Sequence, residues 1–174
     1  MSTSGDRKIT YCVVMPARNT GSMVGDVLDG LSPETLARLS RLVLLDNAST
    51  DDTLDRIRSF VAARPSLADR TTVIANEVDI GYGGSIKRGF DEAVAGSCSH
   101  ALIIHSDDQC DWDRTLTRLM DLAEAEQRPD VVLACRFLPG SDISDYSRLR
   151  RFGNSFFNVY TQVVTGLTIP DPGT

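Results

Sequence analysis

Short apolar runs rich in β-branched residues recur along the chain and alternate with longer stretches that have helical periodicity. The runs cover residues 9–15, 42–45, 71–75, 101–104 and 131–134. Their apolar character is continuous instead of alternating, which is typical of strands that are covered on both faces in a parallel sheet. Parallel neighbours need crossover connections, which are usually helices. The sequence therefore predicts an α/β fold with a mainly parallel sheet flanked by helices.

The stretches between the runs carry apolar residues on one helical face, for example at Leu54, Ile57 and Phe60. With 174 residues, the chain is within the usual size range of one domain. We predict one domain over residues 9–174, preceded by a polar, disordered tail at residues 1–8.

Bulk properties exclude several classes of partner and location. The formal net charge of −6 disfavours nucleic acid, because phosphate neutralisation needs a surplus of Lys and Arg. No apolar run is long enough to cross a bilayer, and the polar start of the chain does not resemble a secretion signal. The four cysteines have no CxxC spacing and are expected to be reduced thiols. We therefore expect a cytoplasmic protein; the sequence carries no signal of oligomeric state.

The residues that follow each predicted strand matter most for function, because ligands of open α/β sheets bind at the carboxyl ends of the strands. The first strand ends in the segment Pro16-Ala17-Arg18-Asn19, which lacks the GxGxxG turn of dinucleotide-binding folds. The chain also lacks the GxxxxGK[ST] phosphate loop. Enzymes that use NAD or FAD and P-loop hydrolases are therefore disfavoured.

Polar segments also follow the second and third strands. After the second comes Asp46, whose carboxylate can accept hydrogen bonds from a base or a ribose. Asp51 and Asp52 come soon afterwards and also fit a plain helix N-terminus. After the third comes a glycine-rich loop at residues 81–85, which leads into a helix with Lys87 in an early turn. Backbone N–H groups in such a loop can bind phosphate, and the glycines alone also serve to turn the chain.

The most specific segment follows the fourth strand and consists of His105-Ser106-Asp107-Asp108-Gln109. Adjacent carboxylates at the end of a buried strand repel each other, and a divalent cation with oxygen ligands offsets that cost. Magnesium in particular binds one or two carboxylates and completes its shell with waters and substrate phosphates. Asp111 instead fits the N-cap of the next helix. The sequence predicts a metal site at this strand end.

Taken in order, these strand-end segments resemble those of the GT-A type glycosyltransferases of family 2, most closely the polyprenyl-phosphate (dolichyl-phosphate) sugar synthase branch. The likeness covers essentially the whole chain from Ile9 onward. In that family the first two segments hold the nucleoside, and an aspartate-any-aspartate motif holds the metal and the donor diphosphate. The resemblance implies inverting transfer of a sugar from a UDP- or GDP-sugar to a polyprenyl phosphate, with Mg2+ or Mn2+ as the cofactor.

By that likeness, Asp46 contacts the base or ribose, and Asp107 is the catalytic metal ligand. The first motif aspartate of the family is replaced by His105, which we assign as a second candidate ligand of the metal. The residues assigned to the nucleotide sugar are Pro16, Ala17, Arg18, Asn19, Asp46, Gly83, Lys87, Ser106, Asp108 and Gln109.

Three arginines extend the resemblance toward the acceptor. Arg136 follows the last predicted strand, and Arg150 and Arg151 begin a helix-like stretch. A lipid phosphate is already an anion, so its glycosylation needs no strong general base, but two negatively charged molecules must be brought together. Arginine forks bind phosphate oxygens, so the three are assigned to the acceptor phosphate, and Arg136 and Arg151 also to catalysis. The alternative is surface charge that only solvates a helix.

The same helix-like stretch carries an apolar stripe, at Phe152, Phe156 and Val163 among others, which we expect to face the core. In the resembling branch this region lies near the membrane, which implies peripheral contact with its inner face. The chain stops at Thr174, where members of the family continue, so we expect it to be truncated on the acceptor side.

Two alternatives stay open. A family 2 transferase with a soluble or polysaccharide acceptor needs a carboxylate base, for which Asp142 or Asp145 is available. A non-catalytic signalling module of the receiver type also carries acids at strand ends, but it needs paired acids after the first strand, and the segment Pro16-Ala17-Arg18 has none.

Overall fold

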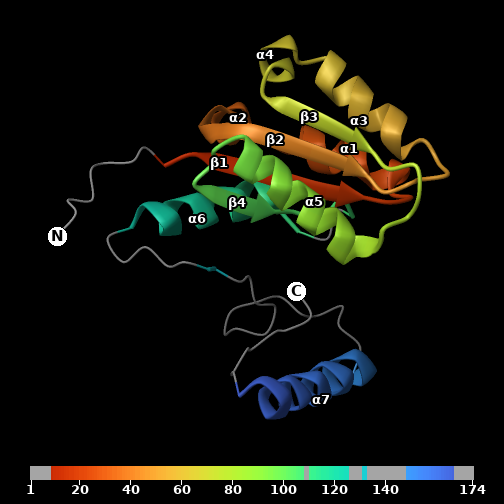
Figure 1. Ribbon diagram of the computed structural model, residues 1–174, viewed down its shortest axis with the longest axis vertical. Coiled ribbons are helices and arrows are strands. Elements are labelled where there is room, and N and C mark those ends of the chain that lie inside the picture. The colour runs from red at the N-terminus through yellow and green to blue at the C-terminus, as the bar shows by residue number, and fades with distance from the viewer. Residues whose placement is uncertain (1–8, 108–109, 126–130, 133–147, 167–174) are drawn as a thin grey trace. The chain divides into compact units, whose positions relative to one another are not determined.

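The computed structural model describes residues 9–107, 110–125, 131–132 and 148–166 (Figure 1). These residues contain a four-stranded sheet in the order β3-β2-β1-β4, in which every neighbouring pair is parallel. The strands are β1 (Tyr11–Ala17), β2 (Leu39–Asp46), β3 (Thr71–Ala75) and β4 (His100–Ile103). The predicted α/β fold with a parallel sheet is confirmed.

Helices connect and flank the strands. They are α1 (Gly21–Asp29), α2 (Pro33–Arg38), α3 (Thr53–Ala62), α4 (Pro65–Ala68), α5 (Gly81–Ala95), α6 (Trp112–Glu124) and α7 (Arg148–Thr165). The chain divides into two units, Met1–Arg128 and Pro129–Thr174, and α7 belongs to the second. The extent of the domain over residues 9–174 stays a prediction.

Side chains alternate along β1 between two core layers, one on each face of the sheet. Val13 and Met15 belong to a large cluster that also contains residues of α1, α3 and α6. Cys12 and Val14 belong to a smaller cluster that includes Ala93 of α5. Because both faces are covered, both sets of side chains must be apolar, which explains the continuous apolar runs.

Helix α5 approaches the sheet closely through a glycine. A Cβ atom built at Gly89 would lie 2.2 Å from Cγ1 of Val14, far inside van der Waals contact. The absence of a side chain at Gly89 therefore sets the distance between α5 and β1.

The ends of three strands are level at one edge of the sheet. Ala17 pairs with Asp46, and Asp46 pairs with Ala75. The N–H of Asn47 donates to the carbonyl of Ala17 at 2.8 Å, and the N–H of Asn76 donates to the carbonyl of Asp46 at 2.9 Å. The polar residues that follow these strands therefore emerge side by side, where ligands of such sheets bind.

Side-chain caps fix where two helices begin. The hydroxyl of Ser32 accepts a hydrogen bond from the N–H of Thr35 at 3.2 Å, at the start of α2. The carboxylate of Asp111 accepts from the N–H of Arg114 at 3.0 Å, at the start of α6. Both satisfy backbone donors that the first helical turn leaves unpaired. The predicted N-cap role of Asp111 is confirmed.

The structure confirms four of the five predicted strands. Four of the predicted strands are present, with ends shifted by up to three residues, as in β2, which begins at Leu39. The fifth is predicted at residues 131–134, of which the structure describes two. These two, Val131 and Val132, are not in a strand and are 73% and 36% exposed. Residues 133–134, the tail at residues 1–8 and the chain end at residues 167–174 lie outside the described residues.

The cysteines that the structure describes are free thiols. They are Cys12, Cys98 and Cys110, whereas Cys135 lies outside the described residues. Burial raises the pKa of the Cys12 thiol to about 12, which makes it an unreactive core residue.

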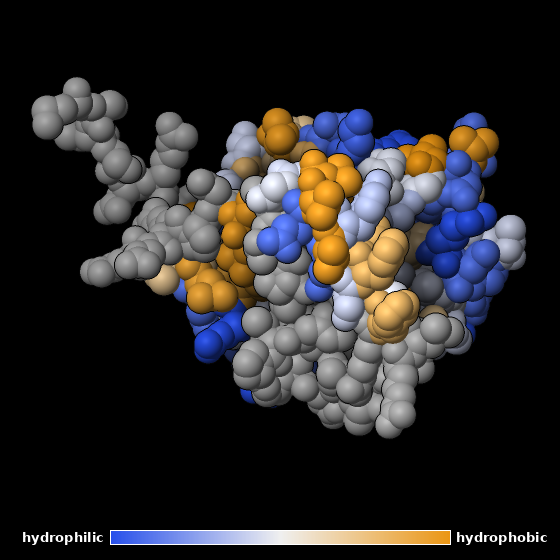
Figure 2. All heavy atoms as spheres, turned by 90° about the horizontal axis from the view of Figure 1, so that it is seen from below, coloured by the Kyte–Doolittle hydropathy of each residue, from blue (hydrophilic) through white to orange (hydrophobic). Residues whose placement is uncertain are grey.

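Helix α7 confirms that the basic segment near the end of the chain is helical. Its apolar stripe is exposed, with Phe152 at 72%, Phe156 at 67% and Val163 at 79%, where the sequence predicts a core-facing surface. Figure 2 shows exposed hydrophobic side chains beside hydrophilic ones on the face that it views. No helix among the described residues is both long and apolar enough to span a bilayer.

Candidate functional site

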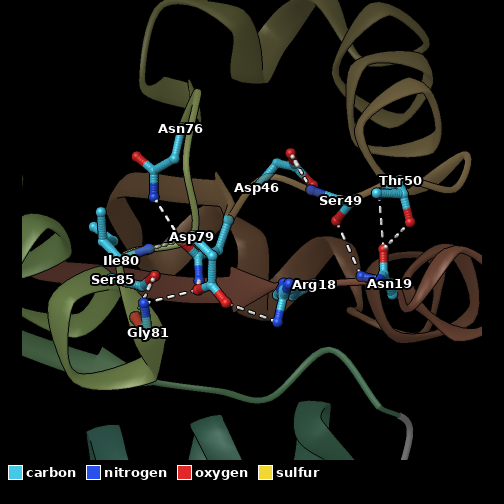
Figure 3. A network of polar contacts seen from close by, with 11 residues as sticks. Arg18, Asn19, Asp46, Ser49, Thr50, Asn76, Asp79, Ile80, Gly81 and Ser85 are labelled. Carbon is cyan, nitrogen blue, oxygen red and sulfur yellow. Dashed lines mark hydrogen bonds and ion pairs between the residues drawn. The ribbon is translucent and has the colours of Figure 1, made fainter.

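Polar side chains from β1, β2 and the loop after β3 form a network at the carboxyl edge of the sheet (Figure 3). The segment after β4 reaches the same edge, because the hydroxyl of Thr20, beyond the end of β1, donates to the hydroxyl of Ser106 at 3.1 Å. The structure thus brings together the segments that the sequence singled out. Pro16 and Ala17 are buried within β1, so their side chains pack in the interior of the protein next to this edge.

Asn19 ties the end of β1 to the loop after β2. Its backbone has a φ of 52°, in the left-handed region that asparagine tolerates better than most residues. Its N–H donates to the hydroxyl of Ser49 at 3.0 Å, and its Oδ1 accepts from the N–H of Thr50 at 2.8 Å. The side chain predicted to bind nucleotide is therefore engaged in holding two strand-end loops together.

Arg18 is paired with a residue that the sequence did not single out. Its guanidinium lies 2.8 Å from Oδ2 of Asp79, and its side chain is 50% exposed. The other oxygen of Asp79 accepts from the N–H of Gly81 at 2.8 Å. That backbone hydrogen bond is the largest cause that lowers the pKa of Asp79, and the amide of Asn47 and the charge of Arg18 lower it further. Asp79 is therefore an anion that orients Arg18.

Asn47 links three segments through its side-chain amide. It donates to Oδ1 of Asp79 at 2.6 Å, and its Oδ1 accepts from Nδ2 of Asn76 at 2.9 Å and from the N–H of Ile80 at 3.1 Å. Asn76 in turn accepts a hydrogen bond from Arg88 of α5. Asn47 and Asn76 are buried, so this chain of hydrogen bonds fixes the edge of the sheet rigidly.

Asp46 is a buried carboxylate with one unused oxygen. The residue is 3% exposed, and its Oδ2 accepts from the N–H of Ser49 at 3.2 Å. Its Oδ1 is buried and has no hydrogen-bond partner among the described residues. A buried oxygen without a partner costs free energy, and such a cost is typical of a binding group held ready for a ligand.

Asp107 has the same property at the end of the fourth strand. Its Oδ1 is buried without a hydrogen-bond partner among the residues described, whereas the neighbouring Ser106 is 5% exposed and bonded to Thr20. Partial burial, and after it the charge of Asp107, raises the pKa of Tyr82. Asp108 and Gln109, which the sequence assigned to the donor, lie outside the described residues.

His105 stacks with two aromatic rings. Its ring centroid is 5.6 Å from that of Tyr82 and 5.7 Å from that of Trp112, with interplanar angles of 17° and 18°. The hydroxyl oxygen of Tyr82 is 3.5 Å from Nε2 of His105. In the described part of the chain, no group of three or more His, Cys, Asp or Glu side chains is placed to hold a metal ion.

The glycine-rich segment is helical, where the sequence predicts a loop before a helix. α5 begins at Gly81, whose φ of 73° suits glycine and whose N–H is bound by Asp79. A Cβ at Gly83 would meet nothing within 4 Å, and Lys87 is exposed one turn later. The segment thus offers an open backbone surface at the start of a helix.

The predicted acceptor residues are described only in part. Arg136 and the alternative bases Asp142 and Asp145 lie outside the described residues. Arg150 and Arg151 lie in the first turn of α7, and the placement of their side chains is likewise outside the description.

Comparison with known families identifies the chain. Residues 12–173 match the family model described as glycosyl transferase family 2. The chain belongs to glycosyl transferase family 2. The membership agrees with the resemblance at the strand ends, whereas the polyprenyl-phosphate branch within the family stays a prediction.

Curated relatives and a solved structure are each similar to 70% of the chain. PGL/p-HBAD biosynthesis glycosyltransferases of Mycobacterium bovis and Mycobacterium tuberculosis are 28% identical over 122 residues, which cover 70% of this chain and 44% of theirs. The mannosyltransferase PcManGT of Pyrobaculum calidifontis, solved in complex with GDP-Man and Mn2+, matches with a TM-score of 0.55 and 16% identity, covering 70% of this chain and 34% of that one. This structural match supports the GT-A type fold.

Proposed function

We propose that the carboxyl edge of the sheet binds the nucleoside diphosphate of a nucleotide sugar, as the donor site of a family 2 glycosyltransferase. The observation that carries this proposal is the pair of buried carboxylate oxygens, Asp46 Oδ1 and Asp107 Oδ1, that lack hydrogen-bond partners among the described residues. Asp46 is the last residue of β2, and Asp107 lies in the segment that follows β4, where ligands of open α/β sheets bind. Family membership supports the same activity.

Asp46 serves the nucleoside in this proposal. A carboxylate only accepts hydrogen bonds, so its free oxygen suits an N–H of a base or an O–H of a ribose. Such bonds to a charged acceptor are roughly twice as strong as neutral ones. Since Asp46 is buried and its other oxygen is fixed by Ser49, the free oxygen is already in place before the ligand arrives.

Asp107 serves a divalent metal ion, Mg2+ or Mn2+. The fit rests on its buried and unpartnered Oδ1, because an anionic oxygen without a donor is stabilised by a hard cation. Such an ion needs few protein ligands when waters and a diphosphate complete its shell. When bound, the metal supplies Lewis-acid stabilisation of the leaving nucleoside diphosphate. The solved mannosyltransferase of similar fold was in complex with Mn2+ and GDP-Man.

Three further groups suit the diphosphate. The open backbone around Gly83 lies in the first turn of α5, where backbone N–H groups favour an anion. Lys87 adds a positive charge on the same helix, and Arg18 adds one from the end of β1. Asp79 holds Arg18 in position and also binds the N–H of Gly81, which leaves the later N–H groups of the first turn of α5 for the diphosphate.

For the acceptor we propose a polyprenyl phosphate. Arg150 and Arg151 lie in the first turn of α7, and Phe152 and Phe156 in the same helix are exposed, a combination that suits an anionic headgroup with an apolar chain. Incubation with a nucleotide sugar and either a short polyprenyl phosphate or a soluble sugar separates the possibilities. A labelled product that partitions into organic solvent is expected, and a water-soluble glycoside would favour the alternative acceptor.

The donor site is tested by thermal shift with UDP- and GDP-sugars, with and without Mn2+. A ligand that binds only the folded protein raises the melting temperature. We expect a shift that needs Mn2+ in the wild type and in Asp91→Ala, which removes an exposed carboxylate of α5 as a matched control. Asp107→Ala is expected to lose the shift. Unchanged nucleotide-sugar affinity and metal dependence in Asp107→Ala would overturn the proposal.

A further inference from the structure

The His105 ring stacks with two aromatic rings, each from a different helix. Tyr82 comes from the first turn of α5, and Trp112 is the first residue of α6. The centroid distances of 5.6 Å and 5.7 Å and the interplanar angles of 17° and 18° describe offset stacking on each side. The three rings form a continuous stack, which we call the Tyr82–His105–Trp112 stack.

The stack is attached to the turn that carries Asp107. His105 precedes Asp107 by two residues, and between them Ser106 is held by the hydrogen bond from Thr20 at 3.1 Å. The turn is therefore fixed by the ring stacking of His105 and by a partly buried pair of hydroxyl groups, those of Thr20 and Ser106. Between these two anchors, the carboxylate of Asp107 keeps one oxygen without a partner among the described residues.

We infer that His105 is a positioning residue, which fixes the carboxylate of Asp107 through the Tyr82–His105–Trp112 stack, and that it is not itself a ligand of the metal. This inference rests on the proposed function of Asp107. Among the described residues, the His105 ring has one polar contact, between its Nε2 and the hydroxyl oxygen of Tyr82. The distance is 3.5 Å, at the limit of a hydrogen bond, so the ring nitrogens contribute little to the placement of His105. The stacking of its flat ring with Tyr82 and Trp112 contributes most.

The His105 ring can act through its flat shape or through its nitrogen atoms, and two substitutions distinguish these roles. A phenylalanine at this position keeps a flat ring between Tyr82 and Trp112 but has no atom that can bind a metal. An alanine removes both the ring and the nitrogens. If stacking is what matters, the two substitutions have different effects on metal and nucleotide binding; if metal ligation matters, they have the same effect.

The experiment compares wild type, His105→Phe, His105→Ala and His100→Phe for binding of Mn2+ with UDP and with GDP by titration calorimetry. The chain has two histidines, and His100 is the matched control because it begins β4, at the other end of the strand. We expect His105→Phe and His100→Phe to bind within about threefold of wild type, and His105→Ala to bind at least about tenfold more weakly, the loss typical of a group that orients a metal ligand.

A spectroscopic measurement provides a second readout. Electron spin-echo modulation of bound Mn2+ detects a coordinated imidazole nitrogen, and we expect none in the wild type. The single tryptophan, Trp112, reports on the stack itself, so its fluorescence should change in His105→Ala more than in His105→Phe.

A nitrogen signal that His105→Phe abolishes and His100→Phe retains would overturn the inference, as would equal losses of affinity in His105→Phe and His105→Ala. Asp107→Ala distinguishes this failure from that of the proposed function. If Asp107→Ala loses binding and His105→Phe loses it equally, only the positioning role is wrong. If Asp107→Ala binds like the wild type, the metal site, and with it the inference, is rejected.

Discussion

The side-chain amide of Asn47 donates a hydrogen bond of 2.6 Å to Oδ1 of Asp79, which joins the end of β2 to the loop after β3. Because Asp79 also pairs with Arg18 at 2.8 Å, this bond connects the buried network of asparagines to an exposed cation at the proposed donor site. Asn47 thus links the buried network to the placement of Arg18.

Replacement of Asn47 by alanine tests how much this network stabilises the fold. The residue is 4% exposed, and its loss leaves the N–H of Ile80 and the amide of Asn76 without their partner. Buried groups left unpaired in this way cost roughly 1–3 kcal/mol, so we expect the free energy of unfolding to fall by about 2 kcal/mol. Urea denaturation followed by circular dichroism measures the change.

The matched control for Asn47→Ala is Ser66→Ala, at an exposed position in α4. A surface change of this kind is expected to alter the unfolding free energy by no more than about 0.5 kcal/mol. Equal effects of the two substitutions would show that the network around Asn47 does not stabilise the edge of the sheet.

Asp46→Asn separates stability from binding at the buried carboxylate. The substitution preserves the shape of the side chain and an oxygen for the N–H of Ser49, and it removes a buried charge whose Oδ1 has no partner among the described residues. We expect the free energy of unfolding to be unchanged or raised, because an under-paired buried charge is costly. Nucleotide binding should weaken by about tenfold or more, since hydrogen bonds to a charged acceptor contribute roughly 1.5–3 kcal/mol.

Parallel chemical denaturation and nucleotide titration of the Asp46→Asn protein check both expectations. A large loss of stability would mean that Asp46 is a structural residue, and unaltered nucleotide affinity would remove it from the proposed donor site.

Gly89→Ala tests the close approach of α5 to β1. The new Cβ would lie 2.2 Å from Cγ1 of Val14, so the helix or the strand must move. Overpacking of this kind costs typically about 1–3 kcal/mol, which exceeds the gain of roughly 0.5–1 kcal/mol that alanine brings to a helix. We expect a net loss of unfolding free energy, measured by denaturant titration.

Gly83→Ala in the same helix is the matched comparison. Its Cβ would meet nothing within 4 Å, so stability should be unchanged or higher, and a drop as large as that of Gly89→Ala would contradict the packing argument. Weaker nucleotide binding by Gly83→Ala would also support close approach of a ligand to the backbone there.

The fold was predictable because continuous apolar strands and periodic helices are local signals. The register that makes Ala17, Asp46 and Ala75 level is not local, and it decides which polar side chains meet. Asp79 was missed for this reason: nothing near it in the sequence distinguishes it from a solvated loop residue. Its role depends on β2 lying between β1 and β3, which brings Asn47 and the loop together.

The glycine-rich segment shows how tertiary contacts override local propensity. Glycines disfavour a helix, so the sequence predicts a loop at residues 81–85. In the structure, Asp79 binds the N–H of Gly81 and the hydroxyl of Ser85 donates to the carbonyl of Gly81 at 3.1 Å, which stabilises the first turn of α5. The stacking of His105 is similarly invisible in the sequence, because Tyr82 and Trp112 come from two different helices.

Asp51 links the starts of two helices and makes stability depend on pH. Its Oδ2 accepts from the N–H of Gly21 at 3.0 Å, in α1, and its Oδ1 accepts from the N–H of Thr53 at 3.0 Å and from the Thr53 hydroxyl at 2.5 Å, in α3. The bond from the Thr53 hydroxyl is the largest cause that lowers the pKa of Asp51. The sequence predicts this carboxylate at one helix N-terminus, and in the structure it accepts hydrogen bonds at the N-termini of two helices.

Because the pKa of Asp51 is lower in the folded chain than the value of about 3.9 in an unfolded one, its contribution is fully present above that pH and is lost as the pH falls toward the folded pKa. We expect Asp51→Asn to melt below the wild type by a constant interval between about pH 6 and 7, and the interval to shrink below about pH 4. Melting curves at fixed ionic strength measure it. Asp69→Asn, at an exposed carboxylate after α4, should follow the wild type throughout, and an interval for Asp51→Asn that persists unchanged in acid would exclude an ionised Asp51 as the source.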